Sequence, residues 1–189
     1  MKVFKKIAVF LLALVLVSGA VDIELPPGSI LSTARAADSP VTAPVTTDDT
    51  TVEGVTTGDK TVAITNVITN NDKVTIPEVV STGGKTYVVD EIGSGAIAKK
   101  YKQVTLILNE NTKVKANIAK SKQAKKTKKI VIKAANGQKL TASQFDKKAF
   151  KGFKGKIVVK KSAMTKKQFK KMVKKLRKGG FKGKIVYSK

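Results

Sequence analysis

The sequence predicts a β-rich α+β fold, in which a short solenoid of stacked strand, turn and helix units follows a disordered N-terminal region. Three observations lead to this prediction. Short apolar runs recur in the C-terminal half, with starts 26, 27 and 28 residues apart. One segment near the C-terminus has the apolar spacing of an amphipathic helix. A Thr-rich stretch before the repeats shows no sustained period, which is typical of a linker.

The composition excludes several classes of protein. The 189 residues include 38 Lys and Arg against 13 Asp and Glu, a formal net charge of +25, with no Cys and no His. The chain therefore lacks the usual ligands of zinc, iron–sulfur and haem sites, and it has neither a His base nor a Cys nucleophile. We predict no enzyme activity, no catalytic residue, no cofactor and no metal site.

Residues 1–37 have the layout of a secretory signal peptide. Three lysines among the first six residues precede the continuous apolar run 7–17. This run is shorter than the roughly 20 apolar residues that a membrane-spanning helix needs. Cleavage could follow Ala20 or lie near Ala36, and the change of composition at Asp38 favours the later site. An uncleaved N-terminal anchor is the alternative. We expect no stable membrane span after cleavage.

Residues 38–60 are expected to form a disordered Thr/Asp-rich spacer. The segment reads DSPVTAPVTTDDTTVEGVTTGDK and contains two prolines and no aromatic residue. Such a stretch buries too little apolar surface to offset the entropy lost when it becomes ordered. Its Val and Thr content leaves a β-edge segment as the alternative.

Residues 61–189 carry the repeats. The apolar runs begin at Val104, Ile130, Ile157 and Ile185, and the last two copies share the hexapeptide FKGKIV. Runs of three to five apolar residues that end at Lys, Asn or Gly are typical of short strands. A single unit of this length could not bury its own apolar face, so we expect the units to stack.

One α-helix is expected at about residues 165–178, where it forms a C-terminal cap together with the last strand. Thr165 can cap its first turn, and Gly179 can end it. Its apolar residues form one stripe, which predicts packing against the last strand: Phe169, Met172, Val173 and Leu176. A membrane-surface helix is the alternative, because the segment is also basic. A second helical turn is expected over residues 143–150.

Two further patterns have a structural interpretation. Gly83-Gly84-Lys85-Thr86 looks like the end of a phosphate-binding loop, but strand-like residues follow it. We therefore predict a hairpin turn between Val79-Val80 and Tyr87-Val88. Most of the aromatic residues of the repeats have the spacing of core residues: Tyr101, Phe150, Phe153, Phe181 and Tyr187.

The charge is divided unevenly along the chain. Residues 1–98 hold 7 basic and 11 acidic groups, whereas residues 99–189 hold 31 basic and 2 acidic groups. Only Arg177 among those 31 is an arginine, and base-specific DNA readers favour arginine for its planar fork. A field of lysines instead indicates diffuse attraction to anionic polymers, with a solvated surface as the alternative. The candidate polyanion-binding residues are the lysine pairs Lys125, Lys126, Lys128, Lys129, Lys147, Lys148, Lys166, Lys167, Lys170, Lys171, Lys174 and Lys175.

Three stretches resemble a known family. They are VTIPEVVSTGGKTYVVDEIGSGAI at 74–97, DKKAFKGFKGKIVV at 146–159, and the lysine-rich ending 165–189. Together they resemble BspA-like leucine-rich repeat surface proteins, especially the lysine-rich exported type of Gram-positive bacteria. The resemblance implies a leucine-rich-repeat-like domain over residues 61–189, a β-rich solenoid and a binding role at the cell surface or in the medium. It implies no catalytic residues.

These observations predict an exported, non-enzymatic protein that binds proteins or glycans, or acts in adhesion. The expected partners are cell-wall or host anionic polymers, or an extracellular protein. The alternative is an exported cationic protein that binds nucleic acid or acts on membranes, although the export signal disfavours nucleic acid as the partner. The sequence carries no signal for a particular oligomeric state.

Overall fold

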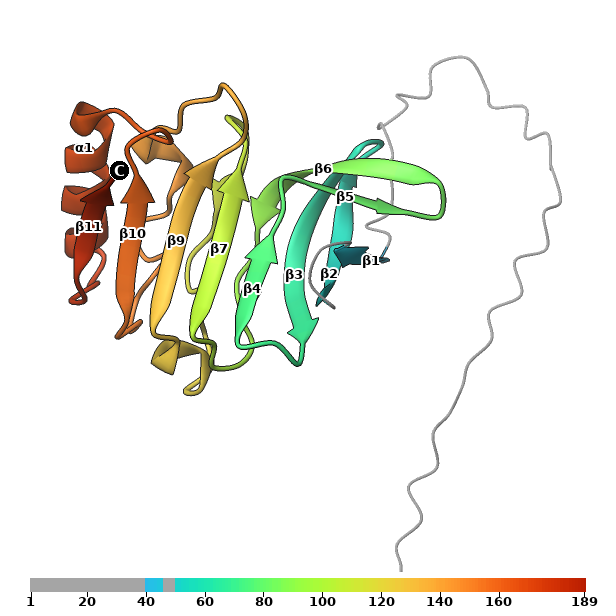
Figure 1. Ribbon diagram of the computed structural model, residues 1–189, viewed down its shortest axis with the longest axis horizontal. Coiled ribbons are helices and arrows are strands. Elements are labelled where there is room, and N and C mark those ends of the chain that lie inside the picture. Colours follow the sequence, from blue (N-terminus) through green and yellow to red (C-terminus); the bar gives the residue numbers. More distant parts are fainter. Residues whose placement is uncertain (1–39, 46–49) are drawn as a thin grey trace, which may run out of the picture. The chain divides into compact units, whose positions relative to one another are not determined.

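A computed structural model describes residues 40–45 and 50–189 of the protein, and its strands form two sheets (Figure 1). The segment expected to be a signal peptide, residues 1–37, lies outside the described residues. In chain order the elements are β1 (Pro40–Val45), β2 (Thr50–Gly58), β3 (Thr61–Thr69), β4 (Lys73–Ile76), β5 (Val79–Thr82), β6 (Lys85–Ile92), β7 (Gln103–Leu108), β8 (Lys113–Val114), the 3₁₀ turn η1 (Ala124–Lys126), β9 (Lys129–Ala134), the 3₁₀ turn η2 (Ala142–Gln144), β10 (Lys156–Lys160), α1 (Lys166–Lys178) and β11 (Ile185–Ser188).

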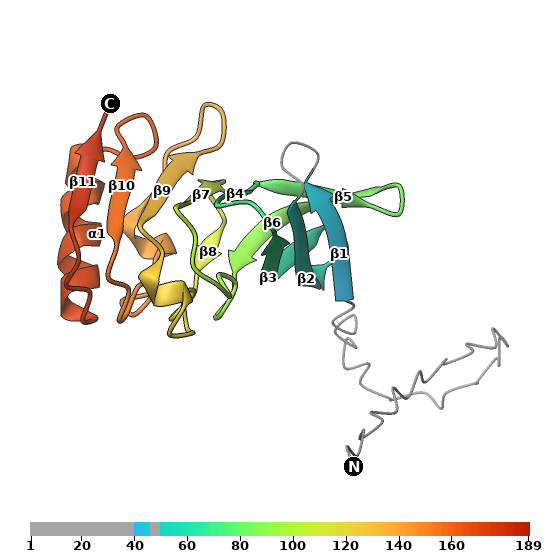
Figure 2. The same cartoon turned by 60° about the horizontal axis from the view of Figure 1, so that its bottom comes forward.

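The first sheet is mixed and has the strand order β1-β2-β3-β6-β5, with β8 also paired to β6. Strands β1, β2 and β3 are antiparallel neighbours, β3 and β6 run parallel, and β5 and β6 form an antiparallel hairpin. The sheet curls so that β1 contacts β5, which gives a half-barrel (Figure 2). Residues Gly83 and Gly84, both with positive φ, make the two-residue turn of the hairpin, as the sequence predicts.

The second sheet is entirely parallel and has the strand order β11-β10-β9-β7-β4. Figure 1 shows its strands side by side. The four residues that begin the repeated apolar runs are register partners across it: Val104 pairs with Ile130, Ile130 with Ile157, and Ile157 with Ile185. The period in the sequence is therefore the period of the parallel strands.

One face of the parallel sheet forms part of the core. Because side chains alternate along a strand, Ile130 and Ile132 of β9, and Ile157 and Val159 of β10, point to the same side and are completely buried. Three aromatic rings belong to the same core, with centroids 6.1 to 6.5 Å apart: Phe150, Phe153 and Phe181. With Tyr101 they are at most 2% exposed, so their expected role as core residues is confirmed.

Helix α1 begins and ends where the sequence predicts. The Thr165 side chain accepts a hydrogen bond from the Gln168 N–H, and Gly179 follows the last turn. Met172 and Leu176 are fully buried in the core. The half-buried Phe169 stacks on Tyr187 of β11 at a centroid distance of 4.7 Å. The apolar stripe therefore packs against the protein, as expected for a helix that covers the last strand.

The predicted solenoid of strand, turn and helix units is wrong. The chain is mostly β-sheet, with a single α-helix in residues 40–45 and 50–189, and six of the eleven strands in these residues belong to the curled mixed sheet. The physical reason lies in the connections. Between β7 and β10 their only helical segments are the short 3₁₀ turns η1 and η2, because segments this short do not offset the cost of nucleating an α-helix, and the second helical turn expected at 143–150 is η2 followed by turns.

The spacer predicted at residues 38–60 is also corrected. Strands β1 and β2 lie within it, and Val52 of β2 is 1% exposed. The β-edge alternative fits better, because β1 is an edge strand that pairs with β2 alone. Prolines within sheets are largely confined to edge strands, because they cannot donate to the ladder, and the sequence of β1 contains two.

Candidate polyanion-binding face

The open face of the parallel sheet carries alternating lysine and valine. Strand β9 reads Lys129-Ile130-Val131-Ile132-Lys133, and β10 reads Lys156-Ile157-Val158-Val159-Lys160. The buried Ile and Val residues occupy alternate positions, so the Lys and Val residues between them point to the other side. We call this surface the lysine–valine face and define it by Lys129, Val131, Lys133, Lys156, Val158, Lys160 and Val186.

The register of the strands arranges these side chains in rows. Lys129 is the partner of Lys156, and Val131 lies beside Val158, which lies beside Val186 of β11. The paired register ends at Ile132 and Val159, and Lys133 and Lys160 are the next residues of the two strands. Neighbouring members of a row are about 4.8 Å apart, and the two lysine rows are about 13 Å apart because four residues of strand separate them.

The rows border a groove of about 430 Å³. Its floor is the valine row, in which Val131 is 7% exposed and the other two valines are half-buried. Lysines stand on both sides of this floor, and Gln103 of β7 and Ser188 of β11 complete the lining. The groove therefore offers an apolar strip between two lines of ammonium groups.

No carboxylate lines the groove. Within residues 40–45 and 50–189 two ion pairs form, Lys102–Asp72 at 2.6 Å and Lys115–Glu91 at 2.9 Å, and neither includes a lysine of the face. The hydrogen bond from Lys102 lowers the pKa of the Asp72 carboxyl and raises the pKa of Lys102. On the face, Lys160 Nζ donates to the Lys189 backbone oxygen, and the other lysines are available to an anion.

This arrangement has an energetic consequence. Like charges placed directly opposite on neighbouring strands destabilise a sheet. The register partners Lys129 and Lys156 repel each other in this way. A sequence that breaks a local rule without a compensating contact often does so at a functional site. A bound polyanion would offset the repulsion between these lysines.

The twelve lysines predicted from the sequence do not lie together. Of these, Lys129 alone belongs to the lysine–valine face, with Lys128 just before it. The others occupy three separate places, namely η1 (Lys125 and Lys126), the turn after η2 (Lys147 and Lys148) and helix α1 (Lys166, Lys167, Lys170, Lys171, Lys174 and Lys175). On α1, Lys175 Nζ is held by the Ala142 carbonyl at 3.4 Å.

Sequence reasoning missed Lys133, Lys156 and Lys160. The signal that identifies them is the five-residue pattern Lys-Ile-Val-x-Lys, which occurs at 129–133 and again 27 residues later at 156–160. The twelve lysines predicted from the sequence are mostly adjacent pairs, which concentrate charge along the chain. On a strand, however, adjacent residues point to opposite faces, so the relevant spacing is two or four residues.

Comparisons with known proteins add no family. No family model, no curated protein and no solved structure matches the chain. No helix in the described part of the chain is long and apolar enough to cross a membrane. The same residues contain no group of three or more acidic side chains placed to hold a metal ion.

Proposed function

We propose that the protein is an exported, non-enzymatic binding protein whose lysine–valine face holds anionic polymers outside the cell. The observation that carries this proposal is the pair of lysine rows on either side of a valine row, with no carboxylate in the lining. Export is proposed from the signal-like residues 1–37. Cell-wall polymers and host glycans are the partners that such a location would offer, and the role would be surface retention or adhesion.

A linear polymer would lie across the strands, along the valine row. Its anionic groups would then meet lysines on both sides, while its uncharged segments would lie over Val131, Val158 and Val186. Lysine ammonium groups act as point charges and impose little geometry on the anion. The site would therefore select for charge density and for a narrow, extended shape, and its affinity would fall as salt rises.

The face fits a glycan better than a nucleic acid. Single-stranded nucleic acids are generally held by aromatic side chains on which bases stack. The lysine–valine face has none, and Tyr101, Phe150, Phe153 and Phe181 are buried. A membrane-active role for α1 is also less favoured, because Met172 and Leu176 of its apolar stripe are already in the core.

The experiment measures how much full chain binds to purified Gram-positive cell walls, at salt concentrations between about 50 and 500 mM. The face variant is K129Q/K133Q/K156Q/K160Q. The matched control removes four lysines from α1, K166Q/K167Q/K170Q/K171Q, all of them exposed. At low salt the face variant should lose roughly tenfold or more in affinity, and the control should lose much less.

Two results would count against the proposal. Equal losses in the two variants would mean that binding depends on total charge and not on the face. Binding by the native chain that does not weaken between the two salt concentrations would exclude a charge-driven mode altogether. Both variants should keep the native circular dichroism spectrum, since the substituted side chains lie at the surface or half-buried beside it.

A further inference from the structure

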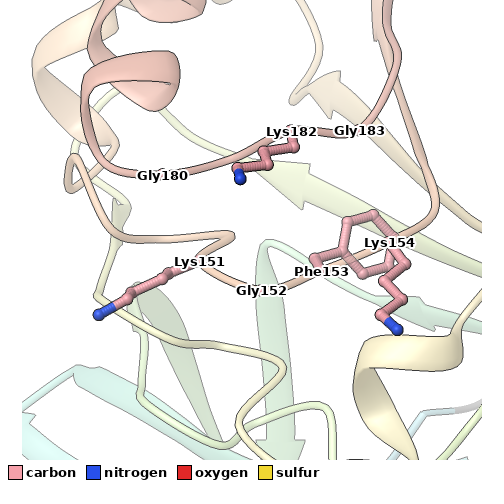
Figure 3. A pocket seen from close by; sticks show the side chains of 7 residues that line it. All are labelled: Lys151, Gly152, Phe153, Lys154, Gly180, Lys182 and Gly183. Carbon is pink, nitrogen blue, oxygen red and sulfur yellow. The ribbon is translucent and has the colours of Figure 1, made fainter.

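A second cavity lies between two successive turns of the parallel sheet, away from the lysine–valine face. It has a volume of about 510 Å³ and is lined by Lys151, Gly152, Phe153 and Lys154 of one turn and by Gly180, Lys182 and Gly183 of the next (Figure 3). We infer that this cavity binds a compact anion carried on a ring, such as a single uronic acid unit. The inference does not rest on the proposed function of the face.

The last two turns lack a hydrogen bond that joins the preceding ones. One repeat earlier, the Lys154 N–H donates to the Lys125 carbonyl at 3.1 Å, and the cavity between those turns is smaller, about 250 Å³. Lys182 is the equivalent of Lys154, since each follows the Phe of an FKGK sequence. In the described chain the Lys182 N–H donates to no carbonyl of the earlier turn. The space thus left open is the cavity.

The charge around the cavity selects an anion. Lys182 reaches over the opening from the upper turn, whereas Lys151 and Lys154 extend away from the opening at opposite ends of the lower turn (Figure 3). All three lysines are exposed, and no carboxylate is among the lining residues. The Lys182 ammonium group and the free Lys182 N–H can both meet one carboxylate or phosphate, and Lys151 and Lys154 add positive potential around the opening.

The walls of the cavity favour a ring. Phe153 belongs to the lining but is only 2% exposed, because its ring stacks on Phe181 in the core, so it closes the base of the cavity and offers a ligand only its edge. The aliphatic stems of the lysines add further apolar surface. Ligand sites of this size, within the range of roughly 300–1,000 Å³, usually combine apolar walls with a few polar groups. The cavity is thus suited to one small ring and not to a length of polymer.

Glycines leave the backbone of the two lining turns uncovered by side chains. Gly152 and Gly180 have φ values of 74° and 90°, which residues with a Cβ rarely adopt. A Cβ at Gly183 would lie 2.5 Å from the Gly155 carbonyl oxygen. Larger residues are therefore excluded from three of the seven lining positions, and a ligand can approach the backbone directly.

The experiment titrates the isotope-labelled full chain with glucuronate, with glucose as the ring without the charge, and with acetate as the charge without the ring. The backbone amide signals of Gly152, Gly180, Lys182 and Gly183 report binding. Glucuronate should shift them with a Kd roughly tenfold or more below that of either control compound. The K151Q/K154Q/K182Q variant should lose roughly tenfold in affinity for glucuronate, whereas K166Q/K167Q/K170Q on α1 should lose less than about threefold.

Three outcomes would overturn the inference. They are acetate binding as tightly as glucuronate, equal losses in the two variants, and shifts confined to β9 and β10. The last outcome would leave the proposed function of the lysine–valine face intact. Conversely, a failure of the face variant to change wall binding would not affect the cavity, because the two sites share no residue.

Discussion

Tyr101 connects the two sheets at the scale of a single residue. Its hydroxyl donates to the Val67 carbonyl of β3 at 3.2 Å, and its N–H donates to Thr127 Oγ1, just before β9, at 3.1 Å. The side chain is 1% exposed, and burial raises the pKa of Tyr101 above its usual value near 10. The folded state therefore keeps the Tyr101 hydroxyl protonated at a pH at which a free tyrosine begins to ionise.

This pKa predicts how stability depends on alkaline pH. Because the folded state keeps a proton that the unfolded state loses, the contribution of Tyr101 is complete below about pH 10 and is lost as pH rises through the raised folded pKa. The tyrosinate absorbance of the native chain, minus that of Tyr101→Phe, gives the titration of Tyr101 alone. Its midpoint should lie above 10. A midpoint at or below that value would contradict the buried position.

Gly179 shows how closely the end of α1 approaches the turn before β10. A Cβ at this position would lie only 1.5 Å from the Lys147 carbonyl oxygen, a backbone atom that cannot move aside cheaply. We expect Gly179→Ala to lower the free energy of unfolding by about 3 kcal/mol or more. Gly95→Ala is the control, since it has no heavy atom within 4 Å and meets only the strain of its positive φ, roughly 1–2 kcal/mol. Urea denaturation measures both, and equal losses would count against the close contact.

At the scale of the element, the lysines of β9 and β10 concentrate positive charge on one face of the sheet, and their repulsion lowers its stability. K129Q/K156Q removes two ammonium groups that are register partners. At low salt we expect this variant to be more stable than the native chain by up to about 1 kcal/mol, the usual limit for charge pairs at the surface, although it should bind cell walls less well. The gain should shrink as salt is added, because screening weakens the repulsion that the substitution removes.

Chemical denaturation at low and high salt measures this effect. A variant that is less stable than the native chain at low salt would show that the two lysines do not repel each other. A gain in stability of the same size at both salt concentrations would point to a cause other than charge.

Some elements could be predicted from the sequence because local signals and packing agree. Gly83-Gly84 supplies the positive φ values of a two-residue hairpin turn, and Thr165 and Gly179 bound a helix with one apolar stripe. The strands that begin at Val104, Ile130, Ile157 and Ile185 follow from the period. The hairpin turn and the helix depend on a few neighbouring residues, and the strands depend on a repeat that is visible in the sequence itself.

Other features depend on partners far along the chain. Strand β2 is held between β1 and β3, and its Thr-rich sequence alone resembles a linker. A period of 26 to 28 residues fixes which strands are equivalent, but it does not say whether a helix or a series of turns joins them. Of the candidate site, only Lys129 was found, because register decides which lysines share a face.

At the scale of the whole molecule, charge is concentrated where the parallel sheet lies. Residues 99–189 hold 31 basic and 2 acidic groups, and they include four of the five strands of this sheet. Such a field attracts any polyanion and speeds its approach. The groove between the lysine rows would then fix where the polymer rests, which separates steering by the whole surface from binding at one place.

The most direct test of this account is a map of backbone amide shifts on the full chain as an oligogalacturonate binds at low salt. We predict the largest shifts in β9 and β10, at Lys129–Lys133 and Lys156–Lys160, and small shifts along α1. The shifts should decline together as salt is raised. Largest shifts on α1, or shifts of similar size at every exposed lysine, would contradict the assignment of binding to the lysine–valine face.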